Sequence, residues 1–347
     1  MNPRHPVRAV ALALAAGLLA ACGSSAASTS ATSEVTVTNC GEATPFPSPA
    51  ERMYVAGDGN LLAAVLALGA QDQVAGVVGL EDAREAMTSA YGSAALTDLT
   101  EATPDYPSME NVVAQRPDVM LAGWNYGYAE EQHLTPDLLR EHGIAGYVLS
   151  ESCRQADGRR GIMPPWEALR ADLTNLGAIT GRTDAAEAVT ADLDRRLAAL
   201  EEAPRAQEPP TVFLFDSGTK QIFTSGSFGA PQAIIEAAGA RNATADVTDT
   251  WTEVSWEQLV ASEPDFFAFV DYDGQSLADK IAVLEANPAT RDLPAVREGR
   301  YLNLPIPAWT SSPLNIDAAE ALRVALEKHG LVPESGIEPA RDLRPSP

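Results

Sequence analysis

The segment Ser108-Met109-Glu110-Asn111-Val112-Val113-Ala114-Gln115-Arg116-Pro117-Asp118 returns 147 residues later as Ser255-Trp256-Glu257-Gln258-Leu259-Val260-Ala261-Ser262-Glu263-Pro264-Asp265. Six of the eleven positions are identical: Ser, Glu, Val, Ala, Pro and Asp. In each copy the Ser can cap a short helix whose first turn carries the Glu, and the Pro-Asp pair then turns the chain into an apolar strand. The repeat predicts two lobes of the same design.

The identical glutamates of the repeat are Glu110 and Glu257. A carboxylate in the first turn of a helix is favoured by the helix dipole, and that alone accounts for one copy. It accounts less well for two equivalent copies, because they place a carboxylate at the same point of each lobe. Both residues are therefore candidates for a functional role.

Short apolar runs alternate with helical patterns on both sides of the repeat, as is typical of parallel sheets with crossover helices. The first half predicts strands at 53–56, 74–78, 119–122 and 146–149, and helices at 61–68, 83–89, 109–114 and 136–142. The second half predicts strands at 211–215, 266–270 and 300–304, and helices at 231–238, 256–262, 277–285 and 316–329. The predicted fold class is α/β, with two Rossmann-like lobes that contain parallel sheets.

The stretch 165–203 between the lobes is almost entirely helix-forming, with one break around Gly181-Arg182-Thr183. A long helix at 184–202 makes the connector stiff. The predicted division of the chain is a signal peptide at 1–21, a lipidated Cys with a tether and an N-terminal extension at 22–49, an N-terminal lobe at 50–163, connecting helices at 164–205, a C-terminal lobe at 206–332 and a tail at 333–347.

The N-terminus has the pattern of an export signal. Arg4 and Arg8 precede an uncharged run at 9–21 that is too short for a relaxed bilayer crossing. The run ends in Leu19-Ala20-Ala21-Cys22-Gly23, which resembles the lipobox of bacterial lipoproteins, in which the Cys thiol takes a diacylglycerol. We expect Cys22 to anchor the exported protein to the outer face of the cytoplasmic membrane, with a Ser/Ala/Thr-rich tether after it; the alternative is a secretory signal with an incidental cysteine.

Two cysteines remain once Cys22 is lipidated, namely Cys40 and Cys153. Thiols are oxidised outside the cytoplasm, so we expect an intramolecular disulfide between them. A free reactive pair and a metal site with two thiolates are the alternatives. The disulfide would join the N-terminal extension to the far end of the first lobe.

Composition excludes several classes of function. The chain has 347 residues and a net charge of −24, and no basic cluster is longer than Arg159-Arg160, so nucleic acid and anionic membrane surfaces are poor partners. It has neither a Gly-x-Ser-x-Gly elbow nor a phosphate loop or Gly-x-Gly-x-x-Gly motif, and too few histidines for a zinc importer's binding protein. We expect a monomeric protein that is not an enzyme and has no cofactor or resident metal.

Open parallel sheets place ligands at the carboxyl ends of their strands, so we expect a binding cleft where the two lobes face each other. The three aromatics at 124–128 fit neither a helical nor a strand period, which favours binding over burial. For the other aromatic candidates the alternative is packing in a core, and for Asp58 and Asn60 it is plain turn chemistry. The candidates are Asp58, Asn60, Trp124, Asn125, Tyr126 and Tyr128 from the first lobe, and Lys220, Phe228, Tyr272 and Trp309 from the second.

A series of segments in this order and spacing resembles the substrate-binding lipoproteins of ABC importers for ferric siderophores and cobalamin, the periplasmic binding proteins of class III. The likeness covers most of residues 50–330. The segments that carry it are 51–55, 66–77, 110–119, 173–181, Phe223-Thr224-Ser225-Gly226 and Trp309. The chain departs from the commonest pattern in having Asn60-Leu61-Leu62 where many members have a Thr-Glu pair.

This resemblance implies two lobes, a rigid helical connector and a ligand held in the cleft between the lobes. It also implies that Glu110 and Glu257 dock with arginines of a membrane permease that works with its ATPase. The family's usual work favours a ferric siderophore as ligand, with cobalamin or another tetrapyrrole as the alternative. A lipid-anchored sensor or scaffold without a transporter is the alternative of another class.

Overall fold

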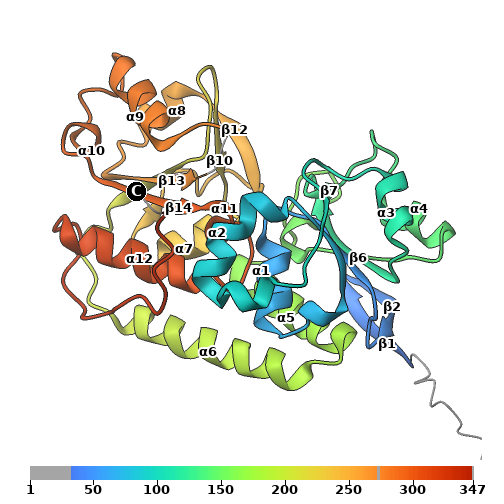
Figure 1. Ribbon diagram of the computed structural model, residues 1–347. Helices are drawn as coiled ribbons and strands as arrows, with labels where there is room; N and C mark the ends of the chain where they lie inside the picture. Colours follow the sequence, from blue (N-terminus) through green and yellow to red (C-terminus); the bar gives the residue numbers. More distant parts are fainter. Residues whose placement is uncertain (1–32, 272–273, 346–347) are drawn as a thin grey trace, which may run out of the picture. The chain divides into compact units, whose positions relative to one another are not determined.

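The computed structural model describes residues 33–271 and 274–345 and contains two parallel sheets (Figure 1). The first sheet has the strand order β5-β4-β3-β6-β7, with β8 also paired to β6. Every pair in it is parallel, as the sequence predicts. Its strands are β3 (Met53–Val55), β4 (Val74–Val78), β5 (Glu101–Thr103), β6 (Val119–Trp124), β7 (Gly127–Tyr128) and β8 (Ala145–Val148).

The second sheet has the order β11-β9-β13-β14 and is also parallel. Its central strands β9 and β13 are buried on both faces and bring Phe213, Phe215, Phe267 and Phe269 into one core. An antiparallel pair, β10 (Ile222–Ser225) with β12 (Trp251–Val254), was not predicted. The strands of the parallel sheet are β9 (Thr211–Phe215), β11 (Arg241–Asn242), β13 (Phe266–Asp271) and β14 (Tyr301–Pro305).

Helices follow the strands in both lobes, which confirms the α/β class. In the first lobe they are α1 (Asn60–Ala67), α2 (Leu80–Tyr91), α3 (Met109–Gln115) and α4 (Pro136–Glu141). In the second lobe they are α7 (Ala230–Ala237), α8 (Trp256–Ala261), α9 (Leu277–Ala286), α10 (Pro294–Arg297), α11 (Ile306–Trp309) and α12 (Asn315–Lys328). No helix in the described part of the chain is long and apolar enough to cross a membrane.

The repeated segment has the same local structure in both lobes. Ser108 and Ser255 each cap a helix, α3 and α8, through a complete capping box with the residue three positions later. The repeated aspartates hold the start of the neighbouring strand: Asp118 accepts hydrogen bonds from the backbone N–H groups of Glu51 and Arg52, and Asp265 accepts one from Thr211. The Ser and the Asp of the repeat therefore have structural roles.

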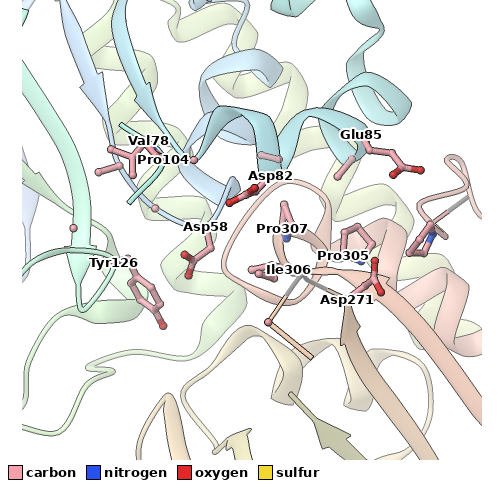
Figure 2. Close-up of a pocket in the computed structure, with 18 of the residues that line it drawn as sticks. Asp58, Val78, Asp82, Glu85, Pro104, Tyr126, Asp271, Pro305, Ile306 and Pro307 are labelled. Carbon is pink, nitrogen blue, oxygen red and sulfur yellow. The ribbon is translucent and has the colours of Figure 1, made fainter. Parts of the chain in front are cut away.

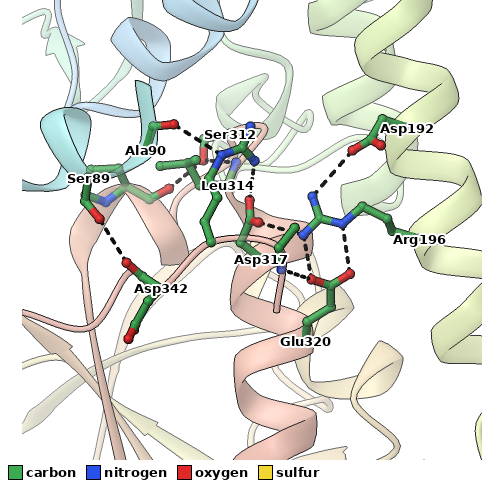
Figure 3. A network of polar contacts seen from close by, with 12 residues as sticks. Ser89, Ala90, Asp192, Arg196, Ser312, Leu314, Asp317, Glu320 and Asp342 are labelled. Atoms are coloured by element: carbon green, nitrogen blue, oxygen red, sulfur yellow. Dashed lines mark hydrogen bonds and ion pairs between the residues drawn. The ribbon is translucent and has the colours of Figure 1, made fainter. Parts of the chain in front are cut away.

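The connector consists of α5 (Pro165–Thr180) and α6 (Thr183–Glu202), as predicted. The break between them is at Gly181, whose φ of +68° suits glycine. Helix α6 carries Arg196, and its guanidinium binds both carboxylate oxygens of Glu320 at 2.8 and 2.6 Å and Asp317 Oδ1 at 2.6 Å (Figure 3). All three side chains are buried, so the ion network joins the connector to α12.

A hairpin of β1 (Ser33–Asn39) and β2 (Glu42–Ser48) precedes the first lobe. The predicted disulfide is present: Cys40 in the hairpin turn is bonded to Cys153, with a Cα–Cα distance of 5.2 Å. The Asn39 side chain also exchanges two hydrogen bonds with the backbone of Val148. The extension is thus fixed to β8. Cys22 lies outside the described residues.

His133 and His142 lie on either side of α4 and not together in one helix. Thr135 caps α4 and Pro136 is its first residue, so the helix begins after His133. His133 lies in a turn with φ of +54°, and His142 follows the last residue of α4.

The two lobes contact each other directly through Glu151, which lies just after β8. Its carboxylate accepts hydrogen bonds from the Trp251 indole N–H at 3.1 Å and from the Ser311 backbone N–H at 2.7 Å, both in the second lobe. The side chain is buried, and desolvation raises the pKa of Glu151 to about 7. This contact is therefore sensitive to protonation near neutral pH.

We expect the Glu151→Gln variant to lose less stability than the native protein as pH rises. A raised pKa in the folded state means that the contribution of Glu151 is complete below the ordinary pKa of 4.5 and is lost as pH rises through about 7. At 1.36 kcal/mol per pKa unit the change is on the order of 3 kcal/mol. Urea unfolding of both proteins between these limits measures it. Parallel profiles of the two proteins would show that Glu151 titrates normally.

Candidate functional site

A pocket of about 730 Å³ lies where the carboxyl ends of the two sheets meet (Figure 2). The first sheet contributes residues that end or follow β3, β4, β5 and β6, and the second contributes residues at the ends of β13 and β14. Parallel strands bring their carboxyl ends to one edge of a sheet, and the chain leaves each strand there as a loop. The strand-end lining residues are Ala56, Gly57, Asp58, Val78, Gly79, Pro104, Asp105, Tyr106, Pro107, Tyr126, Gly127, Asp271, Gly274, Pro305, Ile306 and Pro307.

Two further segments complete the wall. Helix α2 contributes Asp82 and Glu85 among others, and the C-terminal tail contributes residues 343–345. The tail is held against α2, because the Ser89 hydroxyl donates to the Asp342 carbonyl at 2.9 Å and Arg341 Nε donates to the Ala90 carbonyl at 3.3 Å. The same Arg341 binds Asp317 Oδ2 of α12 at 2.9 Å.

The lining is acidic. It includes five carboxylates, Asp58, Asp82, Glu85, Asp105 and Asp271, against one described base, Arg344. Figure 2 shows the Asp58 and Asp82 side chains from neighbouring elements at the centre of the pocket. Desolvation, followed by repulsion from Asp216, raises the pKa of Asp58 to about 6. At neutral pH the pocket nevertheless holds several negative charges.

Tyr126 is the buried ring of the pocket, at 6% exposure. It follows a tight turn in which its N–H donates to the Gly123 carbonyl and Asn125 adopts φ of +66°. A Cβ at Gly123 would lie 2.5 Å from the Tyr126 ring, so the glycine lets the ring pack down on β6. The Tyr126 hydroxyl has no hydrogen-bond partner in the described structure. Burial raises the pKa of Tyr126, which keeps it a neutral phenol.

Of the residues selected from the sequence, Asp58 and Tyr126 line the pocket. Asn60 does not: it is fully buried as the first residue of α1, and its Oδ1 accepts the Leu61 N–H. Asn125 and Lys220 are exposed outside the lining. Tyr272 lies outside the described residues.

The other selected aromatics do not line this pocket either. Trp309 is fully buried and donates its indole N–H to the Phe269 carbonyl, because α11 turns it into the core directly after β14. Tyr128 is fully buried in β7 and donates to the Met120 carbonyl. The Trp124 ring is covered by the Arg154 guanidinium at 3.7 Å. Phe228 packs against Gly161. A Cβ atom added to Gly161 would lie 2.2 Å from the Phe228 Cβ atom.

Several lining residues were not selected from the sequence. The strand-end rule could have found Asp271, which ends β13, and Asp105 and Tyr106, which follow β5 between two prolines. Asp82 faces the pocket from the first turn of α2, and the tail lies along α2. Nothing in the local sequence pattern indicates either placement.

Glu110 and Glu257 are both exposed in the first turns of α3 and α8. Glu110 forms no hydrogen bond or ion pair with any described residue, whereas the Glu257 carboxylate is hydrogen-bonded to its own backbone N–H and to the Ser255 side chain, which lower its pKa. The two helices lie in different lobes, and each is well apart from α6 in Figure 1. Neither glutamate lines the pocket.

Comparison with known proteins agrees with this architecture. The family model described as "Periplasmic binding protein" matches residues 55–307. A periplasmic binding protein from Veillonella parvula is 25% identical over 86% of this chain and 98% of its own, with a TM-score of 0.69. An Fe³⁺-hydroxamate transport protein from Saccharomonospora viridis is 24% identical over 84% and 98%, with a TM-score of 0.68.

A periplasmic heme-binding protein from Pseudomonas aeruginosa is 25% identical over 86% of this chain and all of its own, with a TM-score of 0.61. The family match spans both sheets and the connector, and these solved structures share the fold along nearly their whole length. The chain therefore belongs to the periplasmic binding protein family, the extracytoplasmic substrate-binding proteins of ABC transport systems, which are not enzymes.

Proposed function

We propose that this protein binds a ferric siderophore in the pocket between its lobes and delivers it to an ABC permease. In this proposal residues 50–163 and 206–332 are the lobes, 164–205 is the connector, and lipid on Cys22 holds the protein at the membrane. The observation that carries the proposal is the pocket of about 730 Å³, lined by polar groups from both sheets. Such a site can surround a ligand from two sides.

The dimensions of the pocket favour a compact chelate. Its volume of about 730 Å³ falls within the range typical of small-ligand sites. A ferric siderophore is a compact ligand that presents polar oxygens around the metal. Cobalamin is larger, because it adds a nucleotide loop and several amide arms to the corrin ring. The volume therefore supports a siderophore over cobalamin.

Haem is the second candidate, and two tyrosines support it. Tyr106 and Tyr126 bring phenols into the pocket, and a tyrosine can ligate haem iron. One of the similar solved structures is also a heme-binding protein. Against haem stand the five lining carboxylates, because they would face the two negatively charged propionates of haem. The charge of the pocket therefore disfavours haem and supports a siderophore complex that is not anionic.

Titration of the mature chain carrying Cys22→Ser tests the ligand class. We expect at least one ferric siderophore to bind about tenfold or more tightly than haemin and cyanocobalamin, a difference of about 1.4 kcal/mol. Tryptophan fluorescence measures binding, with a ferric trihydroxamate and a ferric tris-catecholate as the siderophores and their iron-free chelators as controls. Tighter binding of haemin or cyanocobalamin would assign a tetrapyrrole instead.

The lipid anchor is tested by labelling cells with a radioactive fatty acid. We expect the native protein to take up label and to sediment with membranes, because two acyl chains suffice for stable anchoring. The Cys22→Ser variant should do neither. The Cys40→Ser/Cys153→Ser variant, which lacks the other two cysteines, should keep the label. An unlabelled native protein would show that the N-terminus is an ordinary secretory signal.

The docking role of Glu110 and Glu257 is tested by reversing both charges. The structural roles of Ser and Asp explain part of the repeat, but the exposed glutamate of each copy has none that both share. We expect Glu110→Arg/Glu257→Arg to abolish uptake of the ferric ligand by cells, while the isolated protein keeps its affinity. A matched reversal on the exposed side of α6, Glu187→Arg/Glu202→Arg, should leave uptake intact. An equal loss of affinity and uptake would place the two glutamates in the binding site.

A further inference from the structure

Three of the pocket carboxylates have no compensating cation. Asp58 follows β3, Asp82 lies in the first turn of α2 and Asp105 follows β5, so they approach the pocket from three separate elements. None of the three forms an ion pair with a described residue. Asp271, in contrast, accepts a hydrogen bond from Asn303 at 2.7 Å.

The lining offers little positive charge in return. Arg344 is the base that the described lining contains, and it is already paired with Asp342: its Nε donates to Asp342 Oδ1 at 2.8 Å and its Nη2 to Oδ2 at 2.5 Å. A ligand in the pocket therefore meets a surplus of negative charge.

A second observation marks the same pocket as a place for a polar ligand. Tyr126 is 94% buried, and its hydroxyl has no hydrogen-bond partner in the described structure although its residue lines the pocket. Figure 2 shows its ring extending from the side of the pocket opposite Pro307, with Asp58 between them. A buried hydroxyl without a partner costs free energy, which a ligand oxygen in the pocket would recover.

We infer that the pocket selects a ligand of net positive charge and that, among ferric siderophores, it takes a hydroxamate complex bearing a protonated amine. This rests on the proposed function and deepens it. Three hydroxamates neutralise the ferric ion, so a free ammonium group makes the whole complex a cation. A ferric tris-catecholate is instead strongly anionic, as is haem at its propionates. The ammonium interacts with Asp58, Asp82 and Asp105, and the Tyr126 hydroxyl donates to an oxygen of the chelate.

The matched probes are two complexes that differ only in this charge. Ferric desferrioxamine B carries a protonated amine, and its N-acetyl derivative has the same chelate but is neutral. We expect the amine complex to bind about tenfold or more tightly, since charge-assisted contacts in a partly desolvated site are strong. The advantage should shrink as NaCl is raised, because salt screens the carboxylates. Ferric enterobactin, an anionic tris-catecholate, should bind more weakly than either.

Variants assign the preference to the pocket. Asp58→Asn/Asp82→Asn should strongly reduce the affinity ratio of the two desferrioxamine complexes, because only Asp105 of the three carboxylates then remains. Unchanged affinity of this variant for the neutral acetylated complex shows that the variant is folded. The matched control Asp98→Asn/Asp184→Asn removes two exposed charges outside the lining and should keep the ratio. If the first variant fails to fold, Asp105→Asn alone should reduce the ratio, because Asp105 is exposed on a loop.

The outcomes separate the inference from the proposed function. Equal binding of the amine and acetylated complexes, or tightest binding of ferric enterobactin, overturns the charge inference and leaves a ferric siderophore as the ligand. A ratio that persists in the Asp58→Asn/Asp82→Asn variant also overturns the inference, because another part of the protein then reads the charge. Binding of haemin or cyanocobalamin alone overturns the proposed function and the inference with it.

Discussion

The arrangement of the lobes depends on the buried ion network around Arg196. The Arg196 guanidinium of the connector binds Asp317 and Glu320 of α12, and Arg341 of the tail supplies the second positive charge at Asp317 (Figure 3). Desolvating a buried charge is unfavourable, so removing one partner of a buried ion pair destabilises the folded protein by about 3–5 kcal/mol. This penalty opposes the separation of α6, α12 and the tail, in addition to the packing of Leu193, Leu197 and Leu200 of α6 in the hydrophobic core.

This ion network also positions part of the pocket wall. Arg341 links Asp317 to the backbone of α2, and the residues that follow it become pocket wall. At a second contact between the lobes, Glu151, which follows β8 of the first sheet, accepts hydrogen bonds from Trp251 and Ser311. The spacing of the two strand-end surfaces is thus set by hydrogen bonds and ion pairs between segments far apart in the sequence.

The sequence was sufficient wherever a local rule decides the structure. The repeated Ser-x-Glu pattern predicted capped helices, Gly181 marked the connector break, and export with two remaining thiols predicted the disulfide. Asp58 followed from the strand-end rule. Trp309 and Tyr128 were placed wrongly, since whether a ring at a strand end faces core or solvent depends on neighbouring layers. The position of the tail could not be predicted from the sequence, because it depends on the ion pair between Arg341 and Asp317, which only the folded structure brings together.

The contacts of Glu151 and of Arg341 between the lobes affect the rates of ligand binding and release. A site whose walls are already fixed loses little conformational entropy when it is filled, so ligand capture is governed by encounter and desolvation. Negative potential over the opening speeds the encounter with a cation and slows that with an anion. The same rigidity lengthens residence, because escape requires breaking ligand contacts without help from a hinge. In the proposed transport function, opening the pocket from either side requires breaking the hydrogen bonds of Glu151 to Trp251 and Ser311 or those of Arg341 to α2 and Asp317.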